Sequence, residues 1–279
     1  MSLHKISFPA DAPCNVTDDV ILQQVARNIK RRLPQAKPYL SNDVEVALVC
    51  GGPSLAQTEL ELVQAWWNGA KVVCVNGSYQ WCIERNIKPS AVVMLDAREF
   101  NKRFVATAVP GCRYLLASQC HPASFDLVEG RDVTIWHACS AGKPELDLLK
   151  AHYGEECYPV TLGTTVAIRA ISLLRMLGFQ SFDIFGLDSC WLGDRHHAYA
   201  QNENDNDKYI ETWLRPRGRD DLAQRFYCAP WMMQQAEDFQ RLIVERGDRF
   251  RLHVRGDGLI ATMMKIAAEL GSVPIVEER

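Results

Sequence analysis

A turn of small residues, Gly51, Gly52, Pro53 and Ser54, follows the apolar run 44–49 and opens an amphipathic stretch. Glycine permits a positive φ and a close approach of the backbone, and the amides of a helix that begins here point at whatever lies above the strand end. The turn therefore predicts a phosphate-binding site. It lacks the later glycines of the dinucleotide motif and the lysine of a Walker loop, so a tight turn with Ser54 as a helix cap explains it equally well.

A second predicted helix start offers the same chemistry. Gly163, Thr164 and Thr165 precede the amphipathic stretch 166–177 and would present free amides and two hydroxyls. Micromolar affinity requires about 8 kcal/mol, whereas one helix terminus contributes about 0.3–1 kcal/mol. We therefore expect both helix starts to converge on the phosphates of one nucleotide. Capping of the helix by the threonines is compatible with that role.

Asn76 and Ser78 follow the apolar run 71–75. Because ligands of parallel sheets bind at the carboxyl ends of strands, we expect these two side chains to reach the base or ribose of the nucleotide. An ordinary turn residue or helix cap is an equally good interpretation of Asn76.

Two carboxylates also end apolar runs, Asp96 after the run 91–95 and Asp188 after the run 181–187. A carboxylate at this edge of the sheet can hold Mg²⁺ against phosphate oxygens, so the pair is the candidate metal site if a metal is used. Two structural roles remain open: Asp188 as a cap of the segment that follows it, and Asp96 as the ion-pair partner of Arg98.

His196 and His197 begin a polar segment, and a histidine there can act as a general acid or base because its pKa lies near working pH. We name His197, His196 and Asp188 as the candidate catalytic residues. Tandem histidines in a polar loop are also commonly just solvated. A zinc site is not expected, since no third ligand stands at a recognisable spacing.

The elements that position these residues alternate between strand and helix. Continuous apolar runs at 44–49, 71–75 and 91–95 are separated by helical patterns, which is typical of a parallel sheet covered on both faces. The sequence predicts an α/β, Rossmann-like fold with a mostly parallel sheet. Residues 1–40 are expected to form an N-terminal helical extension, and residues 41–279 one nucleotide-binding domain with a lid insertion at about 189–229, where no hydrophobic period stands out.

Composition narrows the class of protein. The chain has 279 residues, 47% of them hydrophobic, and a net charge of −3, which argues against a general nucleic-acid binder. The ten cysteines are scattered without a CxxC pair, which favours a reduced, cytoplasmic protein. No apolar run approaches the roughly 20 residues of a membrane span. The oligomeric state stays open.

These motifs, in this order, resemble the 6-hydroxymethylpterin diphosphokinase-like family, which includes the motility accessory factors that glycosylate flagellin. The resemblance covers about residues 44–270 and rests on the following segments: the turn 51–55, Ile87-Lys88-Pro89 before a strand closing on Asp96, Gly163-Thr164-Thr165 before Leu177-Gly178-Phe179, Gly186-Leu187-Asp188, and His197-Ala198. More distantly, the layout is similar to bacterial CMP-sialic acid sialyltransferases, which carry a Gly-x-Gly-Pro-Ser turn and an Asn that Asn76 matches. The lid downstream of Tyr199 contains no histidine, so their catalytic histidine has no match by position.

The resemblance implies a nucleotide-dependent transferase with one of two chemistries. One is glycosyl transfer from a nucleotide-activated nonulosonic acid of the CMP-sugar type, which the Gly-Pro-Ser turn and Asn76 favour. The other is Mg²⁺-dependent diphosphate transfer from ATP to a hydroxymethylpterin, which Asp96 and Asp188 favour. A non-catalytic nucleotide-binding protein is the third alternative, because the lid histidine is missing.

Overall fold

A computed structural model describes residues 16–140, 142–201, 209–216, 218–246, 251–270 and 275–278. Its main sheet has eight strands in the order β10-β7-β1-β2-β3-β4-β5-β6, and every registered pair is parallel. The strands are β1 (Asn42–Val49), β2 (Lys71–Val75), β3 (Ala91–Met94), β4 (Arg113–Ala117), β5 (Val133–Ala138), β6 (Pro159–Val160), β7 (Phe179–Phe185) and β10 (Arg251–Val254). The expected α/β, Rossmann-like fold is confirmed.

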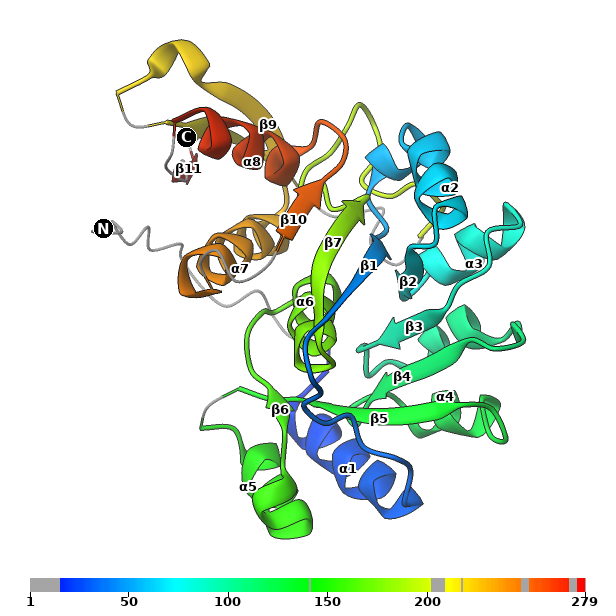
Figure 1. Cartoon of the computed structure of the whole chain (residues 1–279). Coiled ribbons are helices and arrows are strands. Elements are labelled where there is room, and N and C mark those ends of the chain that lie inside the picture. The colour runs from blue at the N-terminus through cyan, green and yellow to red at the C-terminus, as the bar shows by residue number, and fades with distance from the viewer. Residues whose placement is uncertain are drawn as a thin grey trace.

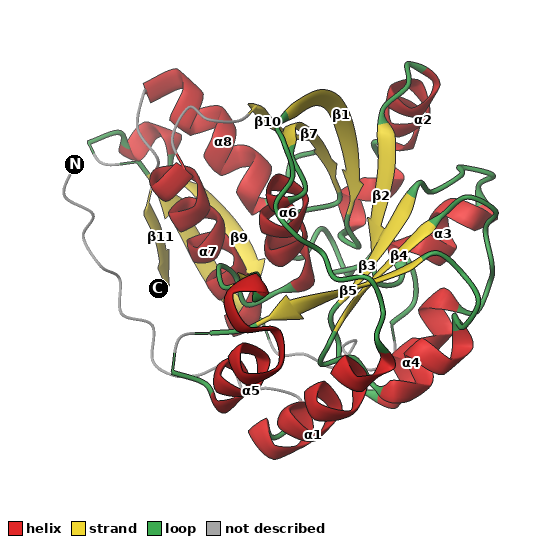
Figure 2. Ribbon diagram, turned by 60° about the horizontal axis from the view of Figure 1, so that its bottom comes forward, coloured by secondary structure: helices red, strands yellow, loops and turns green. Residues whose placement is uncertain are grey.

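Helices cover both faces of this sheet (Figures 1 and 2). They are α1 (Asp18–Asn28), α2 (Glu59–Trp67), α3 (Ser78–Glu84), α4 (Pro122–Leu127), α5 (Pro144–Tyr153), α6 (Val166–Met176), α7 (Pro230–Arg246) and α8 (Leu259–Leu270). The central strands are apolar and buried on both sides, as the parallel topology requires, and their side chains form one core with buried residues of α2, α3, α6, α7 and α8. Buried residues of α1 and α5 form a second, smaller cluster. None of the helices in the described part of the chain has the length and apolar content needed to cross a membrane.

The N-terminal helix begins and ends as its sequence dictates. The Thr17 hydroxyl accepts a hydrogen bond from the Val20 amide, Asp18 and Asp19 occupy the first turn, and Arg27 lies in the last turn. A short 3-10 helix, Ile29–Arg31, continues it. The helix packs against α4 and α5 at the β5 end of the sheet, where the buried Asn28 donates to the carbonyls of Ser118 and Cys120. Residues 1–15 lie outside the described part.

The segment expected to be a structureless lid contains a β-hairpin. Strands β8 (Ile210–Arg215) and β9 (Gln224–Cys228) pair antiparallel, and β11 (Ile275–Glu278) adds a third strand on the other side of β8. Buried and more exposed residues alternate along the two strands of the hairpin: Thr212 and Leu214 are buried in β8, and Phe226 and Cys228 in β9. The segment before the hairpin, from Ser189 to Gln201, has no regular secondary structure.

The strand order reverses between β1 and β7. From β1 the chain runs outward through β2, β3, β4, β5 and β6, and then returns through α6 to place β7 on the other side of β1. The carboxyl ends of β1 and β7 are therefore a topological switch point, where open α/β sheets bind their ligands. The turn 51–54 and Asp188 both lie there.

Gly52 lies close to the backbone at this switch point. A Cβ at Gly52 would lie 2.7 Å from the carbonyl oxygen of Gly186 and 2.3 Å from Asp188 Oδ2, whereas the three atoms nearest to one at Gly51 belong to the side chains of Tyr199 and His197. Side chains can move aside more readily than the end of a buried strand.

We predict that Gly52→Ala lowers the free energy of unfolding by about 1–3 kcal/mol, the usual cost of overpacking, and that Gly51→Ala lowers it by less. Urea unfolding of the two variants beside wild type measures this. Equal losses for the two variants would contradict the backbone clash.

Candidate functional site

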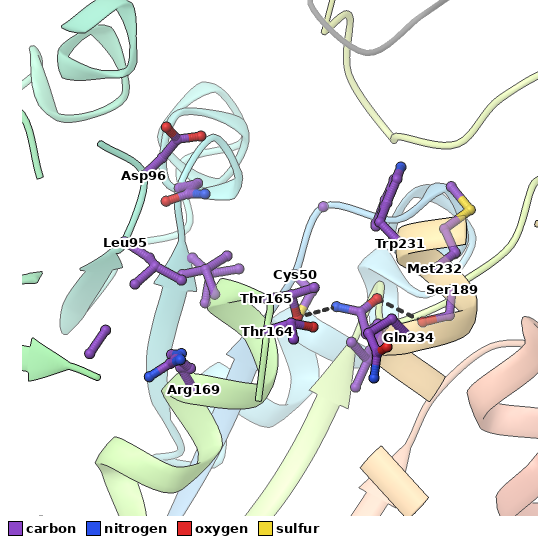
Figure 3. A pocket seen from close by; sticks show the side chains of 18 of the residues that line it. Cys50, Leu95, Asp96, Thr164, Thr165, Arg169, Ser189, Trp231, Met232 and Gln234 are labelled. Atoms are coloured by element: carbon purple, nitrogen blue, oxygen red, sulfur yellow. Dashed lines mark hydrogen bonds between the residues drawn. The ribbon is translucent and has the colours of Figure 1, made fainter. Parts of the chain in front are cut away.

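A cleft of about 910 Å³ opens at the carboxyl ends of the strands. It collects most of the residues that the sequence singled out, and Figure 3 shows part of its lining. The sequence-predicted residues that line it are Gly51, Gly52, Asn76, Asp96, Thr164, Thr165, Asp188, His196 and His197. Four others, Pro53, Ser54, Ser78 and Gly163, are buried behind the surface and are not among the lining residues.

Three amides of the turn 51–55, those of Gly52, Ser54 and Leu55, already have acceptors within the protein. Gly52 donates to the Gly186 carbonyl at 2.8 Å, Ser54 to Asp188 Oδ2 at 2.9 Å, and Leu55 to the Gly52 carbonyl at 3.1 Å. The carboxylate of Asp188 thus takes the place that we expected for a ligand phosphate at the start of the short 3-10 helix Pro53–Ala56. The turn joins β1 to β7 rather than presenting a row of open amides.

The glycines of the turn are needed for space and not for a left-handed backbone. Gly52 has φ −68°, and neither Gly51 nor Gly77 is among the residues with positive φ. These glycines therefore do not use the positive φ that glycine permits. Instead, a Cβ at Gly51 would lie 2.6 Å from Tyr199 Oη, and one at Gly77 would lie 2.7 Å from Tyr199 Cε2. The backbone thus closely approaches Tyr199, which belongs to the polar segment. The Ala198 amide holds this segment in place by donating to the Gly51 carbonyl at 2.9 Å.

The second helix start is also occupied by side chains. The backbone amide and the hydroxyl of Thr164 both donate to Asp238 Oδ2 at 2.7 Å, and Asp238 is buried on α7. Gln235, one turn earlier on α7, donates to the Thr165 hydroxyl and accepts from the Ser189 hydroxyl, each at 2.7 Å (Figure 3). A second protein carboxylate therefore lies just before the helix start that was expected to hold phosphate, whereas the N-cap residue Thr165 makes no side-chain cap hydrogen bond to α6.

Asn76 and Ser78 differ sharply. Asn76 lines the cleft in a left-handed backbone conformation, φ 47°, and its Oδ1 atom is buried with no hydrogen-bond partner among the described residues. Ser78 turns inward: its hydroxyl donates to the carbonyls of Val49 and Val75 and accepts from the Val75 amide. Ser78 thus links the ends of β1 and β2, and only Asn76 of this pair lines the cleft.

Asp96 is bound by an arginine two residues away. Arg98 Nη2 lies 2.6 Å from Asp96 Oδ2, and Arg98 Nε and its backbone amide both reach Oδ1. This is the ion pair that the sequence left open. Because the guanidinium takes both carboxylate oxygens, Asp96 has little room left for a metal ion. Within the described residues, no group of three or more His, Cys, Asp or Glu side chains could hold a metal.

Asp188 is 2% exposed, and its environment favours the protonated form. Burial raises the pKa of its carboxyl to about 6, the hydrogen bonds from Ser54 oppose the shift, and Asp257 adds to it. Its Oδ1 atom has no hydrogen-bond partner among the described residues, and the loop 256–258 packs directly against it. A buried carboxyl of this kind binds its proton more tightly in the folded chain than in the unfolded chain.

The two histidines meet in the cleft with their rings 4.4 Å apart. Burial, with a smaller contribution from His196, lowers the pKa of His197 to about 3, so this ring is neutral at pH 7. Its Nδ1 atom is buried without a hydrogen-bond partner among the described residues. His196 packs against Trp191 at 4.5 Å, inside the polar segment. His196 is therefore buried, and His197 is half-buried where it lines the cleft.

Sequence reasoning gave no role to several cleft residues. Tyr199, Arg169, Gln235 and Asp238 all shape the cleft or its walls, and none stands in a recognisable motif. Arg169 had one available signal: it is a charged residue within the otherwise apolar face of the stretch 166–177. Asp238 had none, because its partner Thr164 lies 74 residues away.

A family model described as 6-hydroxymethylpterin diphosphokinase MptE-like matches residues 21–194, more than half of the chain. The chain belongs to this family, which confirms the resemblance seen in its motifs. Among solved structures, the chain is similar to the MAf glycosyltransferase from Magnetospirillum magneticum AMB-1, with 16% identity and a TM-score of 0.62 over 88% of this chain and 37% of that one. At this identity the likeness shows the fold, and the chain spans little more than a third of that protein. The comparison with curated proteins found no match.

The raised pKa of Asp188 predicts a dependence of stability on pH. Its contribution is fully present below the unfolded pKa of about 4 and is lost as pH rises through the folded value of about 6. Relative to wild type, Asp188→Asn should gain stability between pH 4 and pH 7, by up to roughly 3 kcal/mol. Urea unfolding at both pH values measures this gain, and the exposed Asp194→Asn serves as the control. An Asp188→Asn difference that is the same at both pH values would contradict the assignment.

Proposed function

We propose that the chain is a nucleotide-dependent transferase of the glycosyltransferase type, whose donor is a CMP-activated nonulosonic acid. Both the family and the structural neighbour carry the names of transferases, which supports the broad class. The observation that carries the finer proposal is that Asn76 and His197 both line this cleft, and that each has a buried polar atom with no hydrogen-bond partner among the described residues. Unpaired buried polar atoms are costly, and a bound ligand would satisfy them.

The charges of the cleft favour a ligand with one phosphate over a triphosphate. Asp188 and Asp238 each place a carboxyl group beside one of the two segments expected to hold phosphate, and Arg98 is held by Asp96. A triphosphate would need several open cations or a metal, whereas the phosphodiester of a CMP-sugar carries a single negative charge. The carbonyl oxygen of Asn76 suits the amino group of a base or a ribose hydroxyl.

His197 is the proposed proton acceptor. In the proposed reaction an acceptor hydroxyl oxygen forms a bond to the anomeric carbon, the bond from that carbon to the phosphate oxygen breaks, and CMP leaves with the electron pair. The hydroxyl proton passes to the neutral imidazole of His197. A bound phosphate beside this ring raises its pKa from about 3, which makes the ring a better base in the complex than in the free protein.

The family description supports a second candidate, a diphosphokinase that uses ATP and Mg²⁺. Mg²⁺ requires open carboxylate oxygens in a near-octahedral arrangement. Asp96 gives both oxygens to Arg98, and the buried Asp188 gives Oδ2 to the Ser54 amide. This pair does not fit the ion as it stands, so the diphosphokinase ranks second.

The binding test is isothermal titration with CMP, CTP, ADP and ATP, each with and without Mg²⁺. We expect CMP to bind without metal, and Asn76→Gly to weaken it about tenfold through the lost hydrogen bond. Glycine keeps the left-handed backbone at position 76. Asn86→Gly is the matched control, since Asn86 is exposed and also left-handed, with φ 57°. If ATP binds, and only in the presence of Mg²⁺, the diphosphokinase replaces the glycosyltransferase as the proposed function. If no nucleotide binds, both proposed functions are wrong.

The catalytic test separates an enzyme from a binding protein. We expect His197→Gln to keep CMP affinity within a few-fold but to slow transfer by about 10²–10⁴, the usual contribution of a general base. His152→Gln is the control, because His152 is exposed on α5 and does not line the cleft. The rate of hydrolysis or transfer of a CMP-sugar is measured by monitoring the release of CMP. Equal rates for the two variants would remove His197 from the reaction.

A further inference from the structure

The cleft continues past the switch point to the ends of β5 and β6. This end is lined by Ser140, Lys143, Glu145 and Arg169, which come from the end of β5, the start of α5 and the first turn of α6. In the sheet, β2, β3 and β4 separate β5 from β1. The cleft therefore has a second region, built from other elements than the switch point.

Arg169 is the buried charge of this region. It is 8% exposed, and Nη1 donates to the carbonyl oxygens of Cys139 and Val160, while Nη2 lies 3.4 Å from Ser140 Oγ. Within the described residues, its three hydrogen-bond acceptors are all neutral. In Figure 3 its side chain leaves α6 on the side away from Ser189 and Gln234.

A buried guanidinium that has no carboxylate among its hydrogen-bond partners is energetically costly, because neutral oxygens do not replace the solvation of its charge. Burial lowers the pKa of Arg169, and the nearby Cys139, Asp238 and Glu145 offset this only in part. A guanidinium carries five N–H donors, so the three hydrogen bonds leave two donors for a ligand. Planar donors of this kind suit a carboxylate or phosphate.

We propose that Arg169 and Ser140 form an anion-binding subsite that holds a carboxylate or phosphate group of the acceptor substrate. The subsite itself follows from the geometry of Arg169, and its assignment to the acceptor rests on the proposed function. The donor nucleotide occupies the switch point, and the acceptor lies at the β5 end of the same cleft with its charged group on Arg169.

The test uses inorganic phosphate and N-acetylneuraminate as separate probes, with the uncharged methyl ester of the latter as a third, in isothermal titrations at constant ionic strength. We expect saturable binding of phosphate, of the carboxylate, or of both, and none of the ester. Arg169→Gln should weaken the bound anion at least about tenfold, and Arg169→Lys less. Arg175→Gln is the matched control, because it removes the same charge from the last turn of α6, outside the cleft lining.

Circular dichroism verifies that the variants are folded, and Arg169→Lys keeps the test open if Arg169→Gln is not. Equal anion affinities in wild type and a folded Arg169 variant would overturn the subsite, as would the absence of saturable binding in wild type. Repeating the titration with saturating CMP-N-acetylneuraminate, whose sugar carries its own carboxylate, locates the anion: undiminished binding supports an acceptor site, and displacement by this donor would overturn the assignment to the acceptor. If CMP does not bind at all while the anion still depends on Arg169, the subsite stands and the proposed donor fails.

Discussion

The hydrogen bond from the Ser54 amide to Asp188 joins the two halves of the structure at the switch point. These residues lie 134 positions apart, at the ends of β1 and β7, where the strand order reverses. Gly52 and Gly258 leave the space into which the Asp188 carboxyl fits, since a Cβ at either position would lie within 3 Å of that residue. The floor of the cleft therefore depends on one buried carboxyl and two glycines, and substitutions there change the shape of the site and the stability of the sheet together.

The same constraint determines what the cleft can bind. A carboxylate from the protein lies beside each of the two segments, Asp188 at the turn 51–54 and Asp238 at Thr164, the residue before the N-cap of α6. Recognition of a ligand can rely on side chains such as Asn76 and His197 at one end and Arg169 at the other. This arrangement suits a donor with one phosphate and an anionic acceptor better than a triphosphate.

Much of the fold was predictable from the sequence, because buried parallel strands read as continuous apolar runs. The run 71–75 coincides with β2, and the run 91–95 matches β3 to within one residue. Short elements were missed: α4 and α5 begin at Pro122 and Pro144, which are helix-start signals, but the helices are too short for a clear period. The hairpin at 210–228 was missed because its alternation of buried and exposed residues lies within a strongly polar segment.

The site was predictable only in its location. Asn76, Asp96 and Asp188 end strands, and the strand-end rule correctly places all three on the cleft. Their partners were not predictable, because Asp238 reaches Thr164 and Ser54 reaches Asp188 through tertiary contacts that no local pattern encodes. For the same reason the glycines of the turn suggested a phosphate, while in the structure they accommodate Tyr199 and Asp188.

The central claim is that a nucleotide binds at the switch point of β1 and β7, and hydrogen–deuterium exchange with and without CMP tests it most directly. The account predicts protection of the amides in residues 50–56, 76–79 and 186–199, which form this part of the cleft, with little change in the hairpin 210–228. Protection confined to other segments, or none at saturating CMP, would contradict it.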